Sequence, residues 1–266
     1  MPDVTSLRDA FADLHHAGTF VMPNIWDVGS ARLFESLGFS AVATTSSGFA
    51  ATLGRHDQTV TLEELVTHVA AVCAAVQIPV SVDSEDGYGD EAEDLVETVD
   101  ALADAGAAGV SIEDYRPKLG LMSMTAATER VGVFADAAKG HGMTVTARAE
   151  NHLYDVDDLD DTIERLQSYA SAGADVVYAP GLIRGDDLAR VVAATERPVN
   201  ALLLPVGPDV AEMRDIGVRR LSTGGALTFV AYGAAARAGK ELMDRGTLDF
   251  TTGALTADDR ERAFGQ

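Results

Sequence analysis

Four segments of this sequence share one pattern, and that pattern constrains the fold more than any other feature of the chain. The segments are ESLGFSAVATTSSG, ADAGAAGVSIEDY, ASAGADVVYAPG and RDIGVRRLSTGG. Each contains the end of a helical run, then a glycine (Gly38, Gly106, Gly173 or Gly217), then a short apolar stretch. A glycine just past a helix end adopts the left-handed conformation that satisfies the last helical carbonyl groups. The pattern therefore predicts four junctions at which a helix is followed by a buried strand.

Four more strand candidates complete the set. Proline or glycine introduces IPVSVD, RPVNALLL and GMTVTAR, and TFVMPN lies near the start of the chain. Strands that alternate with helices form right-handed βαβ units and a parallel sheet. Eight such units in about 250 residues are typical of a (β/α)8 TIM barrel. A doubly wound open sheet is the alternative, but no Gly-rich dinucleotide-binding fingerprint follows the first strand.

The chain has no Pro- or Ser-rich linker that would divide it into two folding units. We therefore predict a single α/β domain, a barrel over residues 1–240. Residues 241–266 lie beyond the eighth strand and its helix. They are expected to form a C-terminal helical extension that packs on the barrel or on a neighbouring subunit.

Composition excludes several classes of function. The sequence contains no stretch of eighteen uncharged apolar residues, so it predicts no membrane span. The net charge of −22 argues against a nucleic-acid partner, because phosphate-backbone binding needs a basic surface. The N-terminal segment lacks the basic and apolar regions of a signal peptide. The single Cys73 can form neither an internal disulfide nor a zinc site of several thiolates. We expect a cytoplasmic protein.

Charged side chains follow neighbouring strands of the predicted barrel. Asp83 and Glu85 come at the end of PVSVDSE, Glu113 at the end of GVSIE, and Arg148 at the end of TVTAR. In this fold the active site gathers at the carboxyl ends of the strands. Three carboxylates at one place repel each other unless a divalent ion or protons intervene. Oxygen ligands without a Cys or His cluster suit Mg²⁺, or Mn²⁺, better than zinc.

Each of these residues also has a structural interpretation. Asp83 alone could cap the following helix, and GYGD could be a solvated turn. Glu113 and Asp114 could pair with Arg116 on the surface, and Arg148 could belong to a structural salt bridge. A metal site is favoured because the apolar runs deliver all of these residues to the same rim.

Four motifs in order, TTSSGFAATLGRHD, VDSEDGYGD, GVSIEDYRPK and TARAEN, resemble the isocitrate lyase/phosphoenolpyruvate mutase superfamily. The resemblance covers nearly the whole barrel. It implies formation or cleavage of a C–C or P–C bond next to a 2-oxo or 2-hydroxy carboxylate, through an enolate-like intermediate stabilised by Mg²⁺. Asp83, Glu85 and Glu113 are similar to the acids that hold the metal, some of them through water.

The same resemblance implies roles for other residues. Ser47, Gly48 and Phe49 match the segment that grips the carboxylate or oxyanion end of the substrate, and Arg148 resembles the anion-binding arginine. Asp57 matches the acid on the gating loop, and Lys118 matches the lysine that opens a second mobile loop. Together with Arg148, Asp57 and Lys118 are the predicted catalytic residues. Members of the superfamily are commonly dimers of dimers, so a homo-oligomer is expected.

Three departures from the family pattern narrow the activity. RPKLGLMSM stands where the isocitrate and methylisocitrate lyases carry a Lys-Cys-Gly-His type motif, so a cysteine acid/base is not expected. Asp83-Ser84-Glu85 replaces the usual Asp-x-Asp of strand three. YAPGLIRGDD offers only Arg184 where phosphonate-processing members hold the phosphonyl group.

These observations predict a Mg²⁺-dependent lyase that decarboxylates, or cleaves a C–C bond in, a small anionic carboxylate. The first alternative is phosphoenolpyruvate mutase or phosphonopyruvate hydrolase activity on a P–C bond. The second alternative is a non-catalytic barrel that binds a ligand. Neither nucleic acid nor a membrane is an expected partner.

Overall fold

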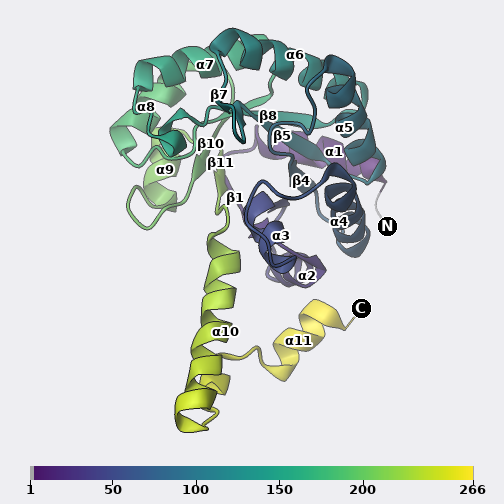
Figure 1. Cartoon of the computed structure of the whole chain (residues 1–266), viewed down its shortest axis with the longest axis vertical. Coiled ribbons are helices and arrows are strands. Elements are labelled where there is room, and N and C mark those ends of the chain that lie inside the picture. Colours follow the sequence, from purple (N-terminus) through teal and green to yellow (C-terminus); the bar gives the residue numbers. More distant parts are fainter. Residues whose placement is uncertain (1–2, 266) are drawn as a thin grey trace.

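The parallel strands close into a barrel because the first strand changes its partner at Pro23. In the computed structural model, which describes residues 3–265, β1 (Phe20–Met22) pairs with β11 (Arg220–Ser222) and β2 (Asn24–Ile25) pairs with β3 (Val42–Thr44). The sheet order is β1-β11-β10-β9-β8-β5-β4-β3-β2. Since β1 and β2 are two parts of one strand, the nine segments make eight barrel strands. The predicted (β/α)8 barrel is confirmed (Figure 1).

The remaining elements follow the predicted alternation. The other barrel strands are β4 (Val80–Asp83), β5 (Gly109–Glu113), β8 (Thr144–Arg148), β9 (Val176–Tyr178) and β10 (Val199–Leu202). The helices of the barrel are α1 (Val4–Leu14), α2 (Val28–Ser36), α3 (Ser46–Thr52), α4 (Leu62–Ala75), α5 (Ala92–Asp104), α6 (Met124–Gly140), α7 (Leu159–Ser171), α8 (Gly185–Ala194) and α9 (Val210–Ile216). A short hairpin, β6 (Tyr115–Arg116) and β7 (Gly120–Leu121), follows β5, and a 3₁₀ turn, η1 (Asn151–Tyr154), follows β8.

The four junction glycines have the conformation that the repeated pattern predicts. Their φ angles are +89° at Gly38, +97° at Gly106, +116° at Gly173 and +101° at Gly217. A β-carbon in this region of φ would clash with the backbone, so glycine is the residue that can turn the chain here. Each of the four leads directly into a barrel strand.

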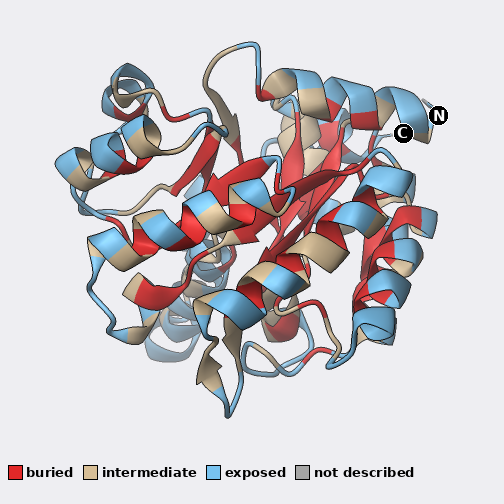
Figure 2. Ribbon diagram, turned by 90° about the horizontal axis from the view of Figure 1, so that it is seen from above, coloured by how far each residue is buried: buried red, intermediate tan, exposed pale blue. Residues whose placement is uncertain are grey.

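The N-terminal helix α1 packs on the barrel next to the start of β8. The Arg8 guanidinium donates to the carbonyl oxygens of Ala103 at 2.8 Å, Ala107 at 3.0 Å and His141 at 2.9 Å, and Phe11 is fully buried. Figure 2 shows the buried strands at the centre, ringed by helices whose outer faces are exposed. The main apolar core therefore lies between the sheet and the helices.

The C-terminal part of the chain leaves the barrel. Helix α10 (Ala226–Arg245) projects away from it, and the chain returns through η2 (Asp249–Gly253) to α11 (Ala257–Phe264), which contacts α2 (Figure 1). The predicted boundary at residue 240 thus falls inside α10. None of the helices in residues 3–265 combines the length and the apolar character that a membrane span requires.

Candidate active site

Strand ends bring three of the predicted site residues to one rim. Asp83 is the last residue of β4, Glu113 the last of β5 and Arg148 the last of β8. These strands are adjacent in the sheet, and Glu113 lies opposite Arg148 in the register. The side chains converge because inward-facing residues of neighbouring parallel strands meet at the carboxyl end of the barrel.

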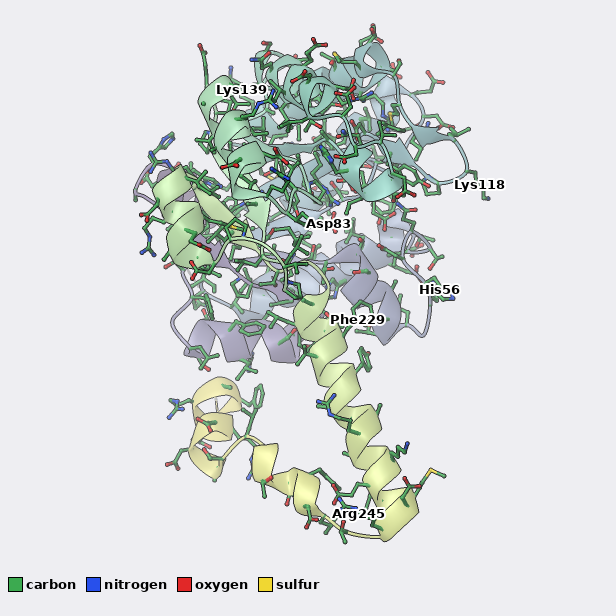
Figure 3. The ribbon with its side chains drawn as sticks, turned by 90° about the vertical axis from the view of Figure 1, so that its left-hand side faces the viewer. His56, Asp83, Lys118, Lys139, Phe229 and Arg245 are labelled. Atoms are coloured by element: carbon green, nitrogen blue, oxygen red, sulfur yellow. The ribbon has the colours of Figure 1, made fainter. Side chains whose placement is uncertain are left out.

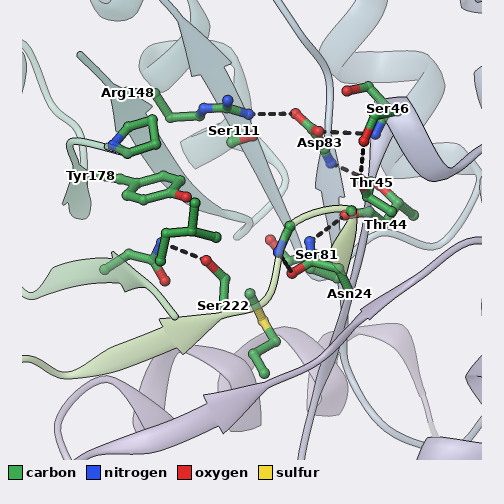
Figure 4. A pocket seen from close by; sticks show the side chains of 18 of the residues that line it. Asn24, Thr44, Thr45, Ser46, Ser81, Asp83, Ser111, Arg148, Tyr178 and Ser222 are labelled. Atoms are coloured by element: carbon green, nitrogen blue, oxygen red, sulfur yellow. Dashed lines mark hydrogen bonds and ion pairs between the residues drawn. The ribbon is translucent and has the colours of Figure 1, made fainter. Parts of the chain in front are cut away.

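The Arg148 guanidinium is the centre of this cluster. It lies 2.8 Å from Asp83 Oδ1, 3.1 Å from Glu113 Oε2 and 2.8 Å from Glu150 Oε1. Its carbon Cζ also stands over the Tyr178 ring, 5.6 Å from the centroid. Figure 4 shows Arg148 and Ser46 on opposite sides of Asp83, whose Oδ2 accepts a 3.0 Å hydrogen bond from the Ser46 N–H. Asp83 thus joins Arg148 to the start of α3.

Carboxylates outnumber cations around this point. Burial raises the pKa of Glu113, although the adjacent Arg148 acts against it, and Glu150, Asp83 and Glu85 raise it further. Burial and then the neighbouring Asp83 raise the pKa of Glu85 to about 8. Buried acids close together favour the protonated form of at least one member unless a cation is added.

A cavity of about 220 Å³ opens at this rim. Its lining includes Ser47 and Asp57 as well as Asp83 and Arg148, so the structure brings these four predicted residues together. Asp57 lies on the exposed loop after α3, at the mouth of the cavity. The position fits an acid on a loop that covers bound substrate.

Gly48 and Phe49 lie beside the cavity and have packing contacts of their own. A β-carbon on Gly48 would stand 2.5 Å from Thr45 Cγ2 and 2.6 Å from Thr228 Oγ1, so glycine permits the close contact between α3 and α10. The Phe49 ring stacks on His68 with the ring centroids 3.9 Å apart. Neither residue lines the cavity in the part of the chain that the structure describes.

Lys118 is a predicted site residue that lies outside the cluster. It occupies the turn of the β6–β7 hairpin with φ +70° and is exposed. Figure 3 shows it at the edge of the molecule, well away from Asp83. A catalytic role for Lys118 therefore requires movement of this hairpin, and its role stays a prediction.

The alternative interpretation, in which Glu113 and Asp114 pair with Arg116 on the surface, is wrong. Arg116 pairs with Asp86 at 2.9 Å and with Asp90, whereas Asp114 is buried and pairs with Arg165 at 3.0 Å. Glu113 pairs with Arg148. The two adjacent acids thus serve different networks, one at the rim and one behind it.

The predicted metal ligands can be tested against the donor chemistry of the site. Among residues 3–265, no three His, Cys, Asp or Glu side chains are grouped so as to hold a metal ion, and Arg148 lies between Asp83 and Glu113. The residues nevertheless fit a divalent cation. The oxygen Oε1 of Glu85 is buried without a hydrogen-bond partner among residues 3–265. The carboxyl groups at the rim also outnumber the single guanidinium of Arg148. Hard oxygen ligands of this kind suit Mg²⁺ or Mn²⁺.

Several polar residues inside the barrel were not singled out from the sequence. Tyr178, Asn200, Arg220 and Ser222 also line the cavity, from β9, β10 and β11. Asn24, in β2, joins the two ends of the sheet, since its Oδ1 accepts from the N–H groups of residues 223 and 224. The sequence feature that could have identified them is the presence of polar residues at alternate positions in these strands, as in Arg220-Leu221-Ser222.

Comparison with known proteins agrees with this geometry. The sequence profile described as phosphoenolpyruvate phosphomutase matches residues 11–243. The chain belongs to this family. It is therefore an enzyme of the phosphoenolpyruvate mutase/isocitrate lyase superfamily, a group of lyases and mutases, as the sequence motifs predicted.

Three relatives illustrate the range of similarity. A candidate lyase/mutase of known structure from Burkholderia cenocepacia is 41% identical, with a TM-score of 0.94 over 100% of this chain and 98% of that one. An uncharacterized protein of Mycobacterium tuberculosis is 35% identical over 237 residues, which are 88% of this chain and 89% of the relative. An oxaloacetate decarboxylase of Bradyrhizobium sp. is 31% identical over 220 residues, 79% of this chain and 74% of that protein.

Proposed function

We propose that this enzyme is a Mg²⁺-dependent lyase that decarboxylates, or cleaves a C–C bond in, a small 2-oxo or 2-hydroxy carboxylate. The observation that carries the proposal is the ion-paired cluster of Asp83, Glu113 and Arg148 at the carboxyl end of the barrel, in which Asp83 and Arg148 line the cavity. Similarity to an oxaloacetate decarboxylase supports the choice of reaction.

The residues of the chain have separable tasks in this proposal. Asp83, Glu85 and Glu113 would hold the metal, directly or through water. When bound, Mg²⁺ supplies a Lewis acid where negative charge develops on the substrate oxygen atoms. Arg148, with five N–H donors and three taken by acids, can bind and orient a substrate carboxylate. Asp57, on the loop over the mouth, would help to exclude water.

The part of the cavity wall that follows β9 favours a C–C bond over a P–C bond. A phosphonyl group carries more negative charge than a carboxylate and needs cationic or polar donors. After β9 the cavity presents Pro180, whereas the Arg184 side chain is 71% exposed, pairs with Asp187 and does not line the cavity. Phosphoenolpyruvate mutase or phosphonopyruvate hydrolase activity remains the second proposal, because these activities also belong to the superfamily.

A cysteine-dependent lyase reaction is not supported. The hairpin after β5 carries Lys118-Leu119-Gly120 in place of a cysteine motif. Cys73 lies on α4, outside the cavity, and burial raises the pKa of its thiol to about 12. A thiol of this kind stays protonated and unreactive near neutral pH.

The test is turnover with defined substrates. Oxaloacetate, substituted malates and phosphonopyruvate are incubated with the protein and Mg²⁺, and release of pyruvate is measured, with EDTA as the metal-free control. We expect Asp83→Ala to abolish turnover and Asp9→Asn, on the exposed face of α1, to leave it unchanged. Full activity of Asp83→Ala, or equal activity in EDTA, would contradict the proposal.

We also propose that the protein is a homo-oligomer in the cytoplasm. Helix α10 carries large apolar side chains that no part of residues 3–265 covers, with Phe229 54% and Met243 89% exposed. Figure 3 shows this helix projecting from the barrel to Arg245 at its tip. Exposed apolar side chains grouped on one projecting helix are typical of an interface with another copy. Analytical ultracentrifugation tests this, and a monomer at micromolar concentration would contradict it.

A further inference from the structure

The cavity contains a second arginine in addition to Arg148. Arg220 is the first residue of β11, so its α-carbon lies toward the amino-terminal end of the barrel, below the rim cluster. The side chain is buried, and it lines the same cavity as Arg148 and Asp83. The proposed lyase reaction uses the rim and assigns no task to this deeper guanidinium.

The protein gives Arg220 three hydrogen-bond acceptors. Its Nε donates to Asn200 Oδ1 at 2.9 Å and its Nη2 to Thr146 Oγ1 at 2.8 Å. Its Nη1 lies 3.4 Å from His15 Nε2. An amide and a hydroxyl carry no charge, so His15 is the one of these three partners that could carry a charge.

His15 is a neutral acceptor. Its Nδ1 lies 2.8 Å from the carbonyl oxygen of Phe11, which can only accept, so Nδ1 carries the proton. The Nε2 atom then has a lone pair for the Arg220 N–H. Burial, and next the charge of Arg220, lower the pKa of His15 to about 3, which agrees with this tautomer.

Arg220 is therefore a buried cation with only neutral partners. In the described part of the chain, no carboxylate lies within ion-pair distance of it, and Arg148, a second cation, repels it across the cavity. Arg148 by comparison has three carboxylates. Two of the five N–H groups of Arg220 have no acceptor in residues 3–265. Burial of an unpaired charge is unfavourable, and an anion in contact with the guanidinium would offset this cost.

We propose that Arg220 is the centre of an anion-binding subsite deep in the cavity, which takes a carboxylate-sized group of single negative charge. The anion is either a free ion or the second carboxylate of the substrate. The second case rests on the proposed function and makes the substrate a dicarboxylic acid held at both ends, by the rim and by Arg220.

The chain offers an isosteric variant that tests this charge argument. Asn200→Asp keeps the size of the side chain and places a carboxylate 2.9 Å from Arg220 Nε, where the amide oxygen now lies. The internal carboxylate would satisfy Arg220 and exclude the external anion. Arg220→Gln removes the charge itself. Arg219→Gln, at the exposed neighbouring position, is the matched control.

The experiment measures thermal unfolding in EDTA as sodium acetate or sodium malonate is added at the same concentrations to each protein. We expect a saturable rise in melting temperature for the wild type and Arg219→Gln. For Asn200→Asp and Arg220→Gln we expect the apparent affinity to fall at least tenfold. The proposal is overturned if the wild type shows no saturable rise, or if Asn200→Asp keeps the wild-type affinity. The wild-type and Asn200→Asp results decide the question even if Arg220→Gln does not fold.

Addition of Mg²⁺ separates the two sources of the anion. If the subsite takes the second carboxylate of a substrate, Mg²⁺ is expected to raise the affinity for malonate and leave that for acetate unchanged. If it takes a free ion, Mg²⁺ changes neither affinity. Both results support the subsite. Both are measured as melting temperatures and do not depend on catalytic activity. Absence of lyase activity together with anion binding at Arg220 would therefore refute the proposed function alone.

Discussion

Replacement of Asp114 by alanine is expected to destabilise the protein by about 4 kcal/mol, because Asp114 is a buried charge with three partners. Its Oδ2 accepts from the Tyr169 hydroxyl at 2.6 Å and from Arg165 Nη1 at 3.0 Å, and its Oδ1 accepts from the Glu150 N–H at 2.8 Å. The Asp114 side chain is 1% exposed. Alanine leaves the hydroxyl and the N–H without acceptors, at about 1–3 kcal/mol each, and removes one of the two carboxylates paired with Arg165.

The matched control is Asp161→Ala. Asp161 pairs with the same Arg165 at 2.7 Å, but its side chain is 29% exposed, and the pair lies within one helix at i,i+4. Such a pair contributes about 0–1 kcal/mol. Urea unfolding of both variants, with equal m-values, gives the difference directly. A loss below about 1 kcal/mol in Asp114→Ala, or equal losses in the two variants, would refute the argument from burial.

The Asp114 network also reaches the active site. Glu150, whose N–H binds Asp114, holds Arg148 Nε at 2.8 Å. Loss of Asp114 should therefore loosen Glu150 and misplace the Arg148 guanidinium. We expect the KM for a carboxylate substrate to rise in Asp114→Ala, measured by pyruvate release, while Asp161→Ala keeps the wild-type value.

Three further outcomes are expected. Gly48→Ala should lose about 1–3 kcal/mol in urea unfolding, because the new methyl group would stand 2.6 Å from Thr228 Oγ1. The pKa of His15 is about 3 in the folded protein and about 6.5 when unfolded, so unfolding takes up a proton in acid. The contribution of His15 to stability should be fully present above about pH 6.5 and fall by about 3 kcal/mol by pH 4.5, and His15→Gln should reduce this slope. Cys73→Ala should keep full turnover, since the thiol lies outside the cavity; a loss of turnover without unfolding would contradict this.

The barrel could be predicted because its signals are local. Each junction glycine is required by a left-handed backbone angle, as at Gly106 with φ +97°, and needs no knowledge of distant contacts. The strand ends follow from the apolar runs, and a parallel barrel brings them to one rim. Asp83, Glu113 and Arg148 could therefore be placed together from the sequence.

Side-chain direction within the site could not be predicted in the same way. Phe49 turns to His68, and Lys118 lies at the tip of a hairpin, because contacts with α4 and the turn geometry decide their positions. The sequence also did not determine which acids pair with Arg148, since Asp83, Glu85 and Glu113 all follow neighbouring strands. Three-dimensional packing selects Asp83, Glu113 and, in addition, Glu150.

The polar interior of the barrel explains how this fold combines stability with a charged site. Strand residues that face the helices are apolar and belong to the main core, such as Val82 and Ile112. Their neighbours that face inward are polar, such as Ser81 and Ser111, which line the cavity. Large-to-small changes in the outer layer create voids and cost about 2–5 kcal/mol, whereas loss of an inward hydroxyl at the cavity wall leaves no such void. Because the outer layer supplies the apolar burial, the inner face can hold Arg148, its acids and the unpaired Arg220 without loss of the fold.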